Sequence, residues 1–330
     1  MRHFVACLDV WAPAVQDLVR RTAPSELDLH FARTYEWDEQ IALVEQAEFL
    51  LPGWAEVTAP MLARARKLKM IQKWGIGVDR IDVQAVRQLG IPLAITAGSN
   101  AGPVAELAIA LMLAVYRRLP YVNQALREGQ WPKAEMRESC FQIAGKTVGI
   151  VGFGAIGRML AHRLRGFDAK VIYFDTRRAN DATEKELSAT YMALDELLAS
   201  SDIVSLHVPF TPETFKMINA ESIATMRDGV VLINTARGEL VDEQALYQAL
   251  YQALTSGKLR GAGLDAFDPE PPLPSNPLLS LDQVVVTPHA GGGVFDNVEN
   301  VARHSLGNIM RHLRGEALRP ADIVVPAALI

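Results

Sequence analysis

The sequence predicts an α/β protein with two domains, each built on a parallel β-sheet that is covered by helices. The chain has 330 residues, which is more than a single hydrophobic core usually organises. Short runs of apolar and β-branched residues recur along it, and stretches with helical spacing stand between them. Strands that alternate with helices form βαβ units, whose sheets are parallel and buried on both faces.

The expected strands are brief, apolar and distributed over the whole chain. They cover Phe4–Leu8, Phe49–Leu51, Met70–Lys73, Thr147–Val151, Lys170–Phe174, Ile203–Leu206, Val230–Ile233, Gly261–Leu264 and Val284–Val286. The expected helices include Ala101–Arg118, Ile156–Gly166 and Glu243–Thr255. We expect residues 1–100 and 292–330 to form one domain and residues 101–291 the other, because the long helix after residue 100 leads out of the first domain.

Composition and charge exclude several classes of protein. The net charge of −5 does not fit the basic face that nucleic-acid-binding proteins carry. The longest apolar run, Leu107–Tyr116, is too short for a bilayer, and the first residues lack the apolar segment of a secretory signal. The two cysteines, Cys7 and Cys140, have neither metal-ligand nor disulfide-scaffold spacing. We therefore expect a cytoplasmic protein without a nucleic-acid or membrane partner.

A glycine-rich turn follows the strand expected at Thr147–Val151. The segment Gly152-Phe153-Gly154-Ala155-Ile156-Gly157 has the spacing G-x-G-x-x-G and lies between a strand and a helix, the context in which this pattern indicates dinucleotide binding. Gly152 permits the tight turn, Gly154 lets a pyrophosphate approach the backbone, and Gly157 lets helix and strand pack closely. The amides at the helix N-terminus, from Ala155 and Ile156 onward, then face the phosphates.

An acidic residue ends the next expected strand. Asp175 can accept hydrogen bonds from both ribose hydroxyls of an adenosine, and its charge repels a 2′-phosphate, so it favours NAD over NADP. Arg177 and Arg178 follow closely and are able to hold such a phosphate, which leaves the strictness of this preference open.

Polar side chains follow three strands of the second half of the chain. Arg237 follows Val230–Ile233, Asp265 and then Glu270 follow Gly261–Leu264, and His289 follows Val284–Val286. Because ligands of parallel sheets bind beyond the carboxyl ends of the strands, these groups are candidates for the chemistry. Arginine binds a carboxylate through a planar fork, histidine transfers a proton to a carbonyl oxygen, and a carboxylate beside the histidine fixes its tautomer.

Each of these residues also has a structural interpretation as a cap, a surface group or a turn residue. His207 ends the expected strand Ile203–Leu206 and competes with His289 for the role of acid, and spacing does not decide between them. No cluster of His, Cys and carboxylate residues has the spacing of a metal site, so we expect no metal. The hydride would then come from a nicotinamide.

Together these segments resemble the D-isomer-specific 2-hydroxyacid dehydrogenase family. The resemblance covers nearly the whole chain and is strongest from Lys73 to Gly292. It is carried by residues 75–82 (GIGVDRID), 104–107 (VAEL), 151–157 (VGFGAIG), 207–209 (HVP), 234–238 (NTARG), 263–271 (GLDAFDPEP) and 287–289 (TPH). Several motifs in the same order are far more specific than any one of them.

The resemblance implies an NAD-dependent enzyme that interconverts a D-2-hydroxy acid and its 2-oxo acid. It implies that His289 is the acid/base, Glu270 its partner and Arg237 the substrate anchor. Further implied cofactor contacts are Val104, His207, Pro209, Thr235 and Asp265, the last facing the nicotinamide amide. Implied substrate contacts are Trp74, Gly75, Ile76, Gly77 and Asn100, with backbone amides of the glycine turn holding the carboxylate.

The resemblance also implies architecture and assembly. It implies two Rossmann/flavodoxin-like domains with the active site in the interdomain cleft, residues 1–100 and 292–330 binding substrate and residues 101–291 binding NAD. It implies a homodimer with residues 101–144 at the interface. One departure is Ala290-Gly291-Gly292, where many members have a hydroxyl residue. Two alternatives stay open: a phosphoglycerate dehydrogenase lacking its regulatory domain, and a dinucleotide-sensing binding protein like the C-terminal binding co-repressors.

Overall fold

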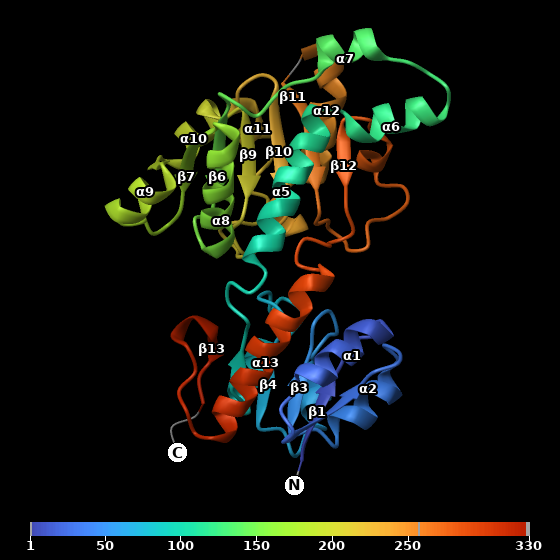
Figure 1. Cartoon of the computed structure of the whole chain (residues 1–330), viewed down its shortest axis with the longest axis vertical. Coiled ribbons are helices and arrows are strands. Elements are labelled where there is room, and N and C mark those ends of the chain that lie inside the picture. Colours follow the sequence, from blue (N-terminus) through green and yellow to red (C-terminus); the bar gives the residue numbers. More distant parts are fainter. Residues whose placement is uncertain (1, 257, 328–330) are drawn as a thin grey trace. The chain divides into compact units, whose positions relative to one another are not determined.

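The structure is a computed structural model, and it describes residues 2–256 and 258–327. The chain divides into two compact units, each with its own sheet (Figure 1). Unit 1 comprises Met1–Asn100 and Gly293–Ile330, and unit 2 comprises Ala101–Gly292. Both units have the α/β architecture that the alternation of strands and helices predicts, and the fold class is confirmed.

Unit 1 contains a six-stranded sheet in the order β13-β5-β4-β3-β1-β2. Its strands are β1 (His3–Cys7), β2 (Leu27–Phe31), β3 (Phe49–Leu51), β4 (Met70–Gln72), β5 (Leu93–Ala94) and β13 (Ile323–Val325). β1 to β5 are parallel, with the 2-1-3-4-5 order of flavodoxin-like sheets. β13 pairs antiparallel with β5, which differs from the purely parallel sheet expected.

Helices cover both faces of this sheet. They are α1 (Pro13–Thr22), α2 (Trp37–Val44), α3 (Ala59–Leu62), α4 (Val83–Gln88) and α13 (Val298–Leu313). One apolar cluster joins the sheet to α2, α3 and α4, and a second joins it to α1 and α13. The chain therefore returns to unit 1 near its end, because α13 and β13 complete that core.

Unit 2 contains a seven-stranded parallel sheet in the order β12-β11-β10-β9-β6-β7-β8. Its strands are β6 (Thr147–Val151), β7 (Lys170–Phe174), β8 (Ala189–Tyr191), β9 (Ile203–Leu206), β10 (Val230–Asn234), β11 (Leu259–Leu264) and β12 (Val284–Val286). Strand order reverses at β6, between β7 and β9, as in Rossmann sheets. Ligands of such sheets bind at this switch point, beyond the carboxyl ends of the strands.

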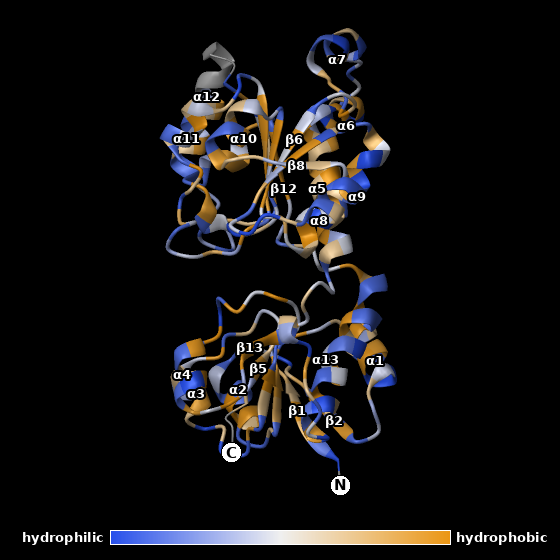
Figure 2. Ribbon diagram, turned by 90° about the vertical axis from the view of Figure 1, so that its left-hand side faces the viewer, coloured by the Kyte–Doolittle hydropathy of each residue, from blue (hydrophilic) through white to orange (hydrophobic). Residues whose placement is uncertain are grey.

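The helices of unit 2 pack on both faces of its sheet. They are α5 (Ala101–Tyr116), α6 (Leu119–Arg127), α7 (Lys133–Ser139), α8 (Ala155–Leu164), α9 (Asp181–Leu187), α10 (Leu194–Ser200), α11 (Ala220–Thr225) and α12 (Glu243–Ser256). Hydrophobic residues concentrate in the strands and on the helix faces turned toward them (Figure 2). The first helix ends at Tyr116, before the expected Arg118, because Arg118 adopts a left-handed conformation (φ 48°). In the described ranges, no helix is long and apolar enough to cross a membrane.

Candidate functional site

The carboxyl edge of the unit 2 sheet carries most of the polar residues singled out above. Gly152 follows β6, His207 follows β9, Arg237 follows β10, Asp265 follows β11 and His289 lies just beyond β12. These strands are parallel, so their carboxyl ends meet at one edge. The candidate groups of unit 2 therefore share the edge where doubly wound sheets bind ligands.

The three glycines of the turn differ in the space that a Cβ atom would find at each position. Gly152 has φ 98°, and a Cβ there would lie 2.7 Å from the backbone of His207. A Cβ on Gly157 would lie 2.1 Å from the carbonyl oxygen of Gly152, so only glycine lets α8 pack this closely. A Cβ on Gly154 would meet nothing within 4 Å, which leaves open space in front of the turn. A pyrophosphate can approach the backbone there.

Asp175 lies beside the turn. Its carboxylate accepts hydrogen bonds from the amide of Phe153 (2.7 Å) and the amide of Arg177 (3.0 Å). In the same region Arg158 lies in the first turn of α8 and donates from Nε to the Phe153 carbonyl (2.9 Å). We did not single out Arg158 from the sequence. The sequence does contain an indication, namely a basic residue in the first turn of the helix after the glycine motif. Its charge is unfavourable at the positive end of the helix dipole unless an anion is bound nearby.

Three of the predicted contacts hold a buried polar atom without a partner among the described residues. These atoms are Nδ1 of His207 and Oγ1 of Thr235 in unit 2, and Oδ1 of Asn100 in unit 1. A buried polar atom without a hydrogen bond is costly, so such atoms commonly await a ligand or water. The two in unit 2, together with the open space at Gly154, fit a dinucleotide along the carboxyl edge.

His207 does not have the surroundings of a proton donor. Its Nε2 lies 2.9 Å from the Ser205 hydroxyl, and burial of the ring lowers the pKa of His207 to about 3. The imidazole is therefore neutral near neutral pH, and no carboxylate is paired with it among the described residues. This favours His289 over His207 as the acid.

His289 and Glu270 form a hydrogen-bonded pair. Nδ1 of His289 lies 2.9 Å from Oε2 and 3.0 Å from Oε1 of Glu270, and Oε1 also accepts from the Phe267 amide (3.0 Å). Burial acts most strongly to raise the pKa of Glu270, but the bonds and charge of His289, the Phe267 amide and the charge of Arg237 outweigh it. The pKa of Glu270 is therefore lowered, which keeps the carboxylate ionised beside the imidazole.

Arg237 is positioned by the backbone at the end of β10. The side-chain amide of Asn234 donates to the Arg237 carbonyl (2.7 Å), and the Arg237 guanidinium donates to the Ala236 carbonyl (2.7 Å). The positive charge of Arg237 acts on Glu270, so the cation, the carboxylate and the imidazole lie in one neighbourhood. They are not on separate surfaces of unit 2.

Asp265 holds the loop that carries His289. Its side chain is buried, and it accepts from the Thr287 hydroxyl (2.6 Å), the Ala290 amide (2.8 Å) and the Gly291 amide (2.9 Å). His289 stands inside this loop with φ 52°, an uncommon conformation that the flanking bonds maintain. No sequence motif indicates this bracing, because the partners lie 22 to 26 residues beyond Asp265. Contact of Asp265 with the nicotinamide stays a prediction.

Thr287→Val is expected to lower kcat about tenfold while changing the Kd of NADH less than twofold. The variant removes one hydrogen bond to a buried carboxylate, worth about 1.5 kcal/mol, and loosens the loop that positions His289. Stopped-flow turnover and fluorescence titration of NADH would measure the two quantities. Thr190→Val, an exposed residue of β8, is the matched control. An unchanged kcat would show that this bond does not position His289.

The remaining contacts expected in unit 2 lie on both sides of the same edge. Val104 is buried in α5, and a Cβ on Gly291 would approach it to 3.4 Å. Pro209 is exposed after β9, and its carbonyl accepts from the Thr214 hydroxyl (2.8 Å). Ala155 and Ile156 form the first turn of α8. All of these positions allow contact with a cofactor at the carboxyl edge of the sheet.

In unit 1, the expected substrate loop follows β4. Gly75 has φ 107°, and its amide donates to the Thr96 hydroxyl (3.0 Å), so this amide is already used within the chain. Within the described ranges, the amides of Ile76 and Gly77 have no protein acceptor. Trp74 is half-buried and packs against Trp11, with ring centroids 4.6 Å apart and ring planes tilted by 54°. The two available amides are the ones able to hold a carboxylate.

Comparisons with known proteins identify the family to which this chain is similar. The family model described as "D-isomer specific 2-hydroxyacid dehydrogenase, NAD binding domain" matches residues 109–291. A hydroxypyruvate reductase of Thermotoga maritima is 41% identical over 281 residues, which cover 84% of this chain and 89% of that protein. A glyoxylate reductase of Korarchaeum cryptofilum is 36% identical over 302 residues, which cover 91% of this chain and 87% of that protein. The crystal structure of a D-lactate dehydrogenase of Aquifex aeolicus, complexed with NAD and lactic acid, superimposes with a TM-score of 0.81 at 28% identity, covering 98% and 99% of the two chains.

Proposed function

The chain belongs to the D-isomer-specific 2-hydroxyacid dehydrogenase family, and from this premise we propose that it reduces a small 2-oxo acid to the D-2-hydroxy acid with NADH, and catalyses the reverse reaction with NAD. The observation that carries the proposal is the pairing of His289 with Glu270 at 2.9 Å, with the charge of Arg237 acting on the same carboxylate. These are the groups that proton transfer to a carbonyl oxygen requires.

Each of the three residues has a separate role in this proposal. Glu270 holds Nδ1 of His289, so Nε2 is the nitrogen that exchanges a proton with the substrate oxygen. The Arg237 guanidinium binds the 2-oxo acid and polarises its carbonyl. In reduction His289 gives its proton as the carbonyl carbon becomes tetrahedral, and in oxidation it takes the proton back.

NAD supplies the hydride acceptor or donor when it is bound, and this chain supplies the surroundings. The turn from Gly152 to Gly157 and the amides of α8 hold the pyrophosphate, and Asp175 receives the ribose hydroxyls. Nδ1 of His207 and Oγ1 of Thr235, which have no hydrogen-bond partner in residues 2–256 and 258–327, would bond to the nicotinamide half of the cofactor. Asp265 holds the His289 loop through its hydrogen bonds, and its carboxylate would accept a further hydrogen bond from the carboxamide of the nicotinamide.

We propose glyoxylate or hydroxypyruvate as the preferred oxo acid. Two relatives that the chain matches over most of their length, at 41% and 36% identity, are a hydroxypyruvate reductase and a glyoxylate reductase. The amides of Ile76 and Gly77 would receive the carboxylate of such an acid. Trp74, which is fixed against Trp11, and Asn100 would bound the substrate.

A substrate panel tests the function directly. NADH loss is followed at 340 nm with glyoxylate, hydroxypyruvate, pyruvate and 3-phosphohydroxypyruvate, and each reaction is repeated with NADPH. We expect turnover on the order of 1–10³ s⁻¹ with one of the first two acids. Preference for the phosphorylated acid would instead favour a phosphoglycerate dehydrogenase. Tight NADH binding without turnover on any acid would favour the dinucleotide-sensing alternative.

Asp175→Ala is expected to reduce the preference for NADH over NADPH about tenfold or more. The carboxylate both repels a 2′-phosphate and receives the amide of Phe153, so its removal weakens NADH binding and relieves the repulsion. The ratio of kcat/KM for the two cofactors measures the effect. Asp181→Ala, at the exposed start of α9, is the control with the same loss of charge. A starting protein that prefers NADPH would contradict the assignment.

We also propose that the chain is a homodimer joined through residues 101–144. Large apolar side chains stand exposed in this segment of unit 2: Leu119 (48%), Leu126 (48%) and Trp131 (75%). Exposed apolar side chains grouped in one segment are typical of an interface. Sedimentation equilibrium should give twice the mass of one chain, and Trp131→Asp should shift the protein toward the monomer. A monomeric starting protein would contradict the proposal.

The compartment that we propose is the cytoplasm. Cys7 and Cys140 are both free thiols, as a reducing environment allows. Fractionation of the host cell with an antibody against the chain would test this, and recovery from an oxidising compartment would contradict it.

A further inference from the structure

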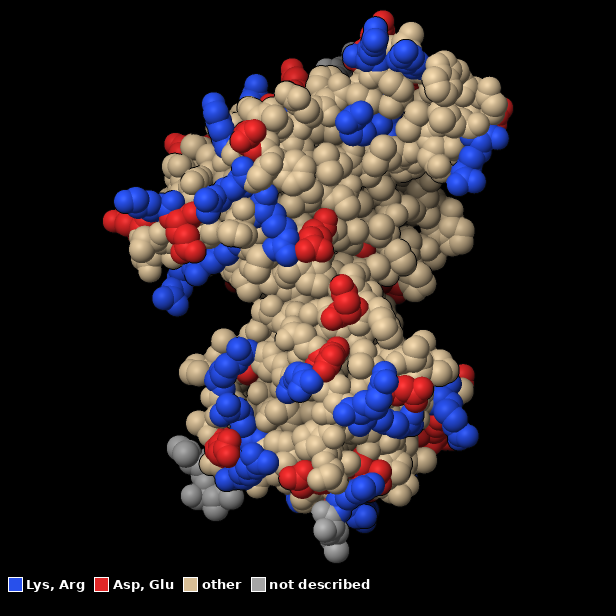
Figure 3. Space-filling view, viewed as in Figure 1, with Lys and Arg blue, Asp and Glu red and all other residues tan. Residues whose placement is uncertain are grey.

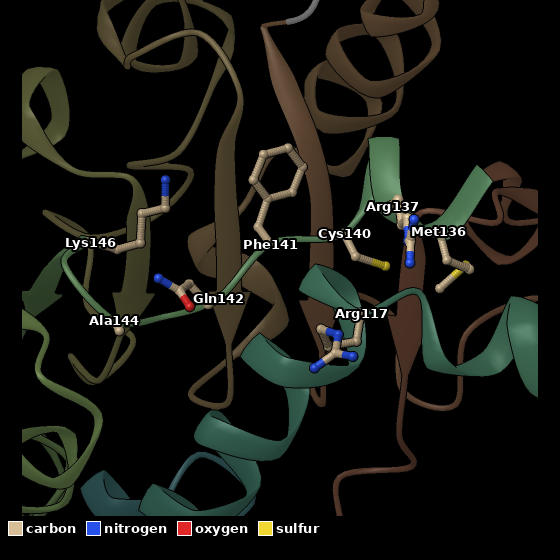
Figure 4. Close-up of a pocket in the computed structure, with 8 residues that line it drawn as sticks. All are labelled: Arg117, Met136, Arg137, Cys140, Phe141, Gln142, Ala144 and Lys146. Atoms are coloured by element: carbon tan, nitrogen blue, oxygen red, sulfur yellow. The ribbon is translucent and has the colours of Figure 1, made fainter. Parts of the chain in front are cut away.

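Two features of the structure lie outside the proposed chemistry, a hollow in unit 2 and a buried charged cluster in unit 1. The hollow has a volume of about 510 Å³ and is shown in Figure 4. All of its lining residues except Lys146 lie in residues 101–144, the segment proposed for the dimer interface, so a second copy of the chain would cover it. The cluster of unit 1 consists of His304 on α13, and of Arg319 and Asp322 just before β13.

Asp322 is the centre of this cluster. The charged side chains that Figure 3 shows on unit 1 lie at the surface, whereas Asp322 is completely buried. Its carboxylate accepts from Nε (2.8 Å) and Nη2 (2.9 Å) of Arg319, and Nε2 of His304 lies 2.9 Å from Oδ2. Burial of Asp322 acts most strongly to raise its pKa, but its bonds with Arg319 and His304 and its other favourable contacts outweigh this effect and lower the pKa to about 2. The cluster therefore holds an ionised carboxylate inside unit 1.

The same carboxylate holds the backbone that follows β5. Oδ1 of Asp322 accepts from the amide of Ala97 (3.1 Å), and the backbone carbonyl of Asp322 accepts from the amide of Ile95 (2.8 Å). Nη2 of Arg319 donates to the Ala97 carbonyl (3.2 Å). Hydrogen bonds to ionised groups are about twice as strong as those between neutral groups. Because a peptide unit is planar, fixing the Ala97 amide also fixes the Thr96 carbonyl in the same unit.

Other polar side chains of α13 bind the same segment. Asn297 and Asn308 donate from Nδ2 to two of its backbone carbonyls, at 2.9 Å and 3.3 Å. His304 lies between them at helical spacing, so α13 presents a row of polar side chains to residues 95–99. The segment is therefore held from one end to the other, and it leads directly into Asn100.

Thr96 connects this segment to the turn proposed to bind the substrate carboxylate. The Gly75 carbonyl accepts from both the amide (2.9 Å) and the hydroxyl (3.0 Å) of Thr96, which is completely buried. The Gly75 carbonyl and the Ile76 amide belong to one planar peptide unit and point in opposite directions. The bonds that hold this carbonyl on Thr96 therefore direct the Ile76 amide away from Thr96, and within the described ranges that amide has no protein acceptor.

We propose that Asp322 is a positioning residue for the substrate. It fixes the peptide unit between Thr96 and Ala97, Thr96 fixes the unit between Gly75 and Ile76, and the Ile76 amide is thereby aimed at the carboxylate of the oxo acid. This inference rests on the proposed function, in which the Ile76 amide binds that carboxylate. A displacement on the order of 1 Å in a group that positions a substrate can cost about 10²-fold in rate, even when its cause is remote.

Asp322→Ala is expected to raise the KM of the preferred oxo acid, and the inhibition constant of oxamate, about tenfold. Oxamate is an unreactive isostere of pyruvate, so its inhibition constant in the NADH complex reports carboxylate binding without turnover. The fall in kcat should stay below about threefold and the change in the Kd of NADH below about twofold, because His289 and the glycine turn belong to unit 2. A general loss of structure would not produce this separation of KM from kcat.

Two further variants serve as the rescue and the control. Asp322→Asn keeps an oxygen that can accept from the Ala97 amide, so it should raise KM only about threefold. Arg303→Gln removes a cation from the neighbour of His304 on α13, where it is paired with Glu299. This control should leave KM and the inhibition constant of oxamate unchanged.

Thr96→Val tests the path from Asp322 to the turn. Valine has nearly the shape of threonine, but its side chain cannot bond to Gly75, so KM should again rise about tenfold. If both residues act through one chain of bonds, Asp322→Ala/Thr96→Val should raise KM about as much as the larger single effect. Independent effects would multiply to about 100-fold.

Two outcomes would overturn the proposal: an unchanged KM and oxamate inhibition constant in folded Asp322→Ala, or single effects that multiply in the double variant. If Asp322→Ala does not fold, Arg319→Gln at a half-exposed position tests the same cluster, with an expected rise in KM of about threefold. A starting protein that turns over no oxo acid would contradict the proposed function instead. Hydrogen exchange of the Gly75 amide, followed by NMR, then tests the bond path: it should be about tenfold faster in Asp322→Ala or Arg319→Gln, and unchanged exchange would overturn the path.

Discussion

His289→Asn should lower kcat for the preferred oxo acid by about 10²–10⁴-fold while the Kd of NADH changes less than threefold. Asparagine keeps a polar group opposite Glu270 but carries no proton that it can give to the substrate oxygen. The loss corresponds to about 3–5 kcal/mol of transition-state stabilisation. Steady-state turnover and NADH titration in parallel would separate the two effects.

The pH dependence sharpens this experiment. The pKa of Glu270 lies below the ordinary value for a glutamate. The pairing of its carboxylate with His289 therefore contributes its full stabilisation at a pH above that ordinary pKa, and this contribution is lost only as the pH falls through the lowered pKa. Glu270 thus stays ionised above about pH 5. The plot of kcat/KM against pH can have a limb above about pH 5. If this limb disappears in His289→Asn, it belongs to the imidazole of His289. A limb that persists in the variant belongs to another group.

Two histidine variants serve as comparisons. His162→Asn, on the exposed side of α8, should leave kcat and the Kd of NADH within twofold of the starting protein. His207→Asn should raise the KM for NADH more than it lowers kcat, because His207 is neutral and lies beside the turn at Gly152. If His207→Asn removed kcat and His289→Asn did not, the assignment of the acid would be reversed.

The main strands could be predicted because they are buried on both faces. Val148, Ile150 and Val151 of β6 are fully buried, and such strands produce the uninterrupted apolar runs that the sequence displays. Two of the strands that we did not predict, β2 and β5, lack this pattern. β2 alternates leucine and phenylalanine with Asp28 and His30 at the edge of its sheet, and β5 has only two residues. Edge position and shortness remove the signal.

The parts of the candidate site that lie within one short sequence motif could be predicted. The contacts between residues far apart in the chain could not. The glycine turn is contiguous, so its backbone needs could be read from the residues alone. The loop at residues 53–55 is different: its amides donate to the buried carboxylate of Asp9, which lies 44 to 46 residues earlier. Such pairings depend on strand order, which follows from packing of the whole sheet. The same reason hid the contacts between Asp265 and the His289 loop.

Gly238→Ala should produce the largest loss of stability among simple substitutions at the site. Gly238 follows Arg237 directly, and a Cβ there would lie 1.9 Å from the carbonyl carbon of Phe267 and 2.5 Å from the amide nitrogen of Asp268. All of the nearest atoms are backbone, so no side chain can rotate away, and the loop that carries Glu270 must move. We expect a loss of about 3 kcal/mol.

The displacement should be visible in both stability and turnover. A loss of that size lowers Tm by roughly 6–12 °C in a domain of this length. Because Phe267 donates its amide to Glu270, moving it also separates Glu270 from His289, so kcat/KM should fall about 10²-fold. Calorimetry and turnover assays on Gly238→Ala and on Gly166→Ala, where a Cβ meets nothing within 4 Å, measure both quantities. If Gly238→Ala had the same Tm and kcat/KM as Gly166→Ala, the turn that carries Arg237 would not lie as close to the Glu270 loop as described. The argument that the charges of Arg237 and Glu270 act at one site would then fail.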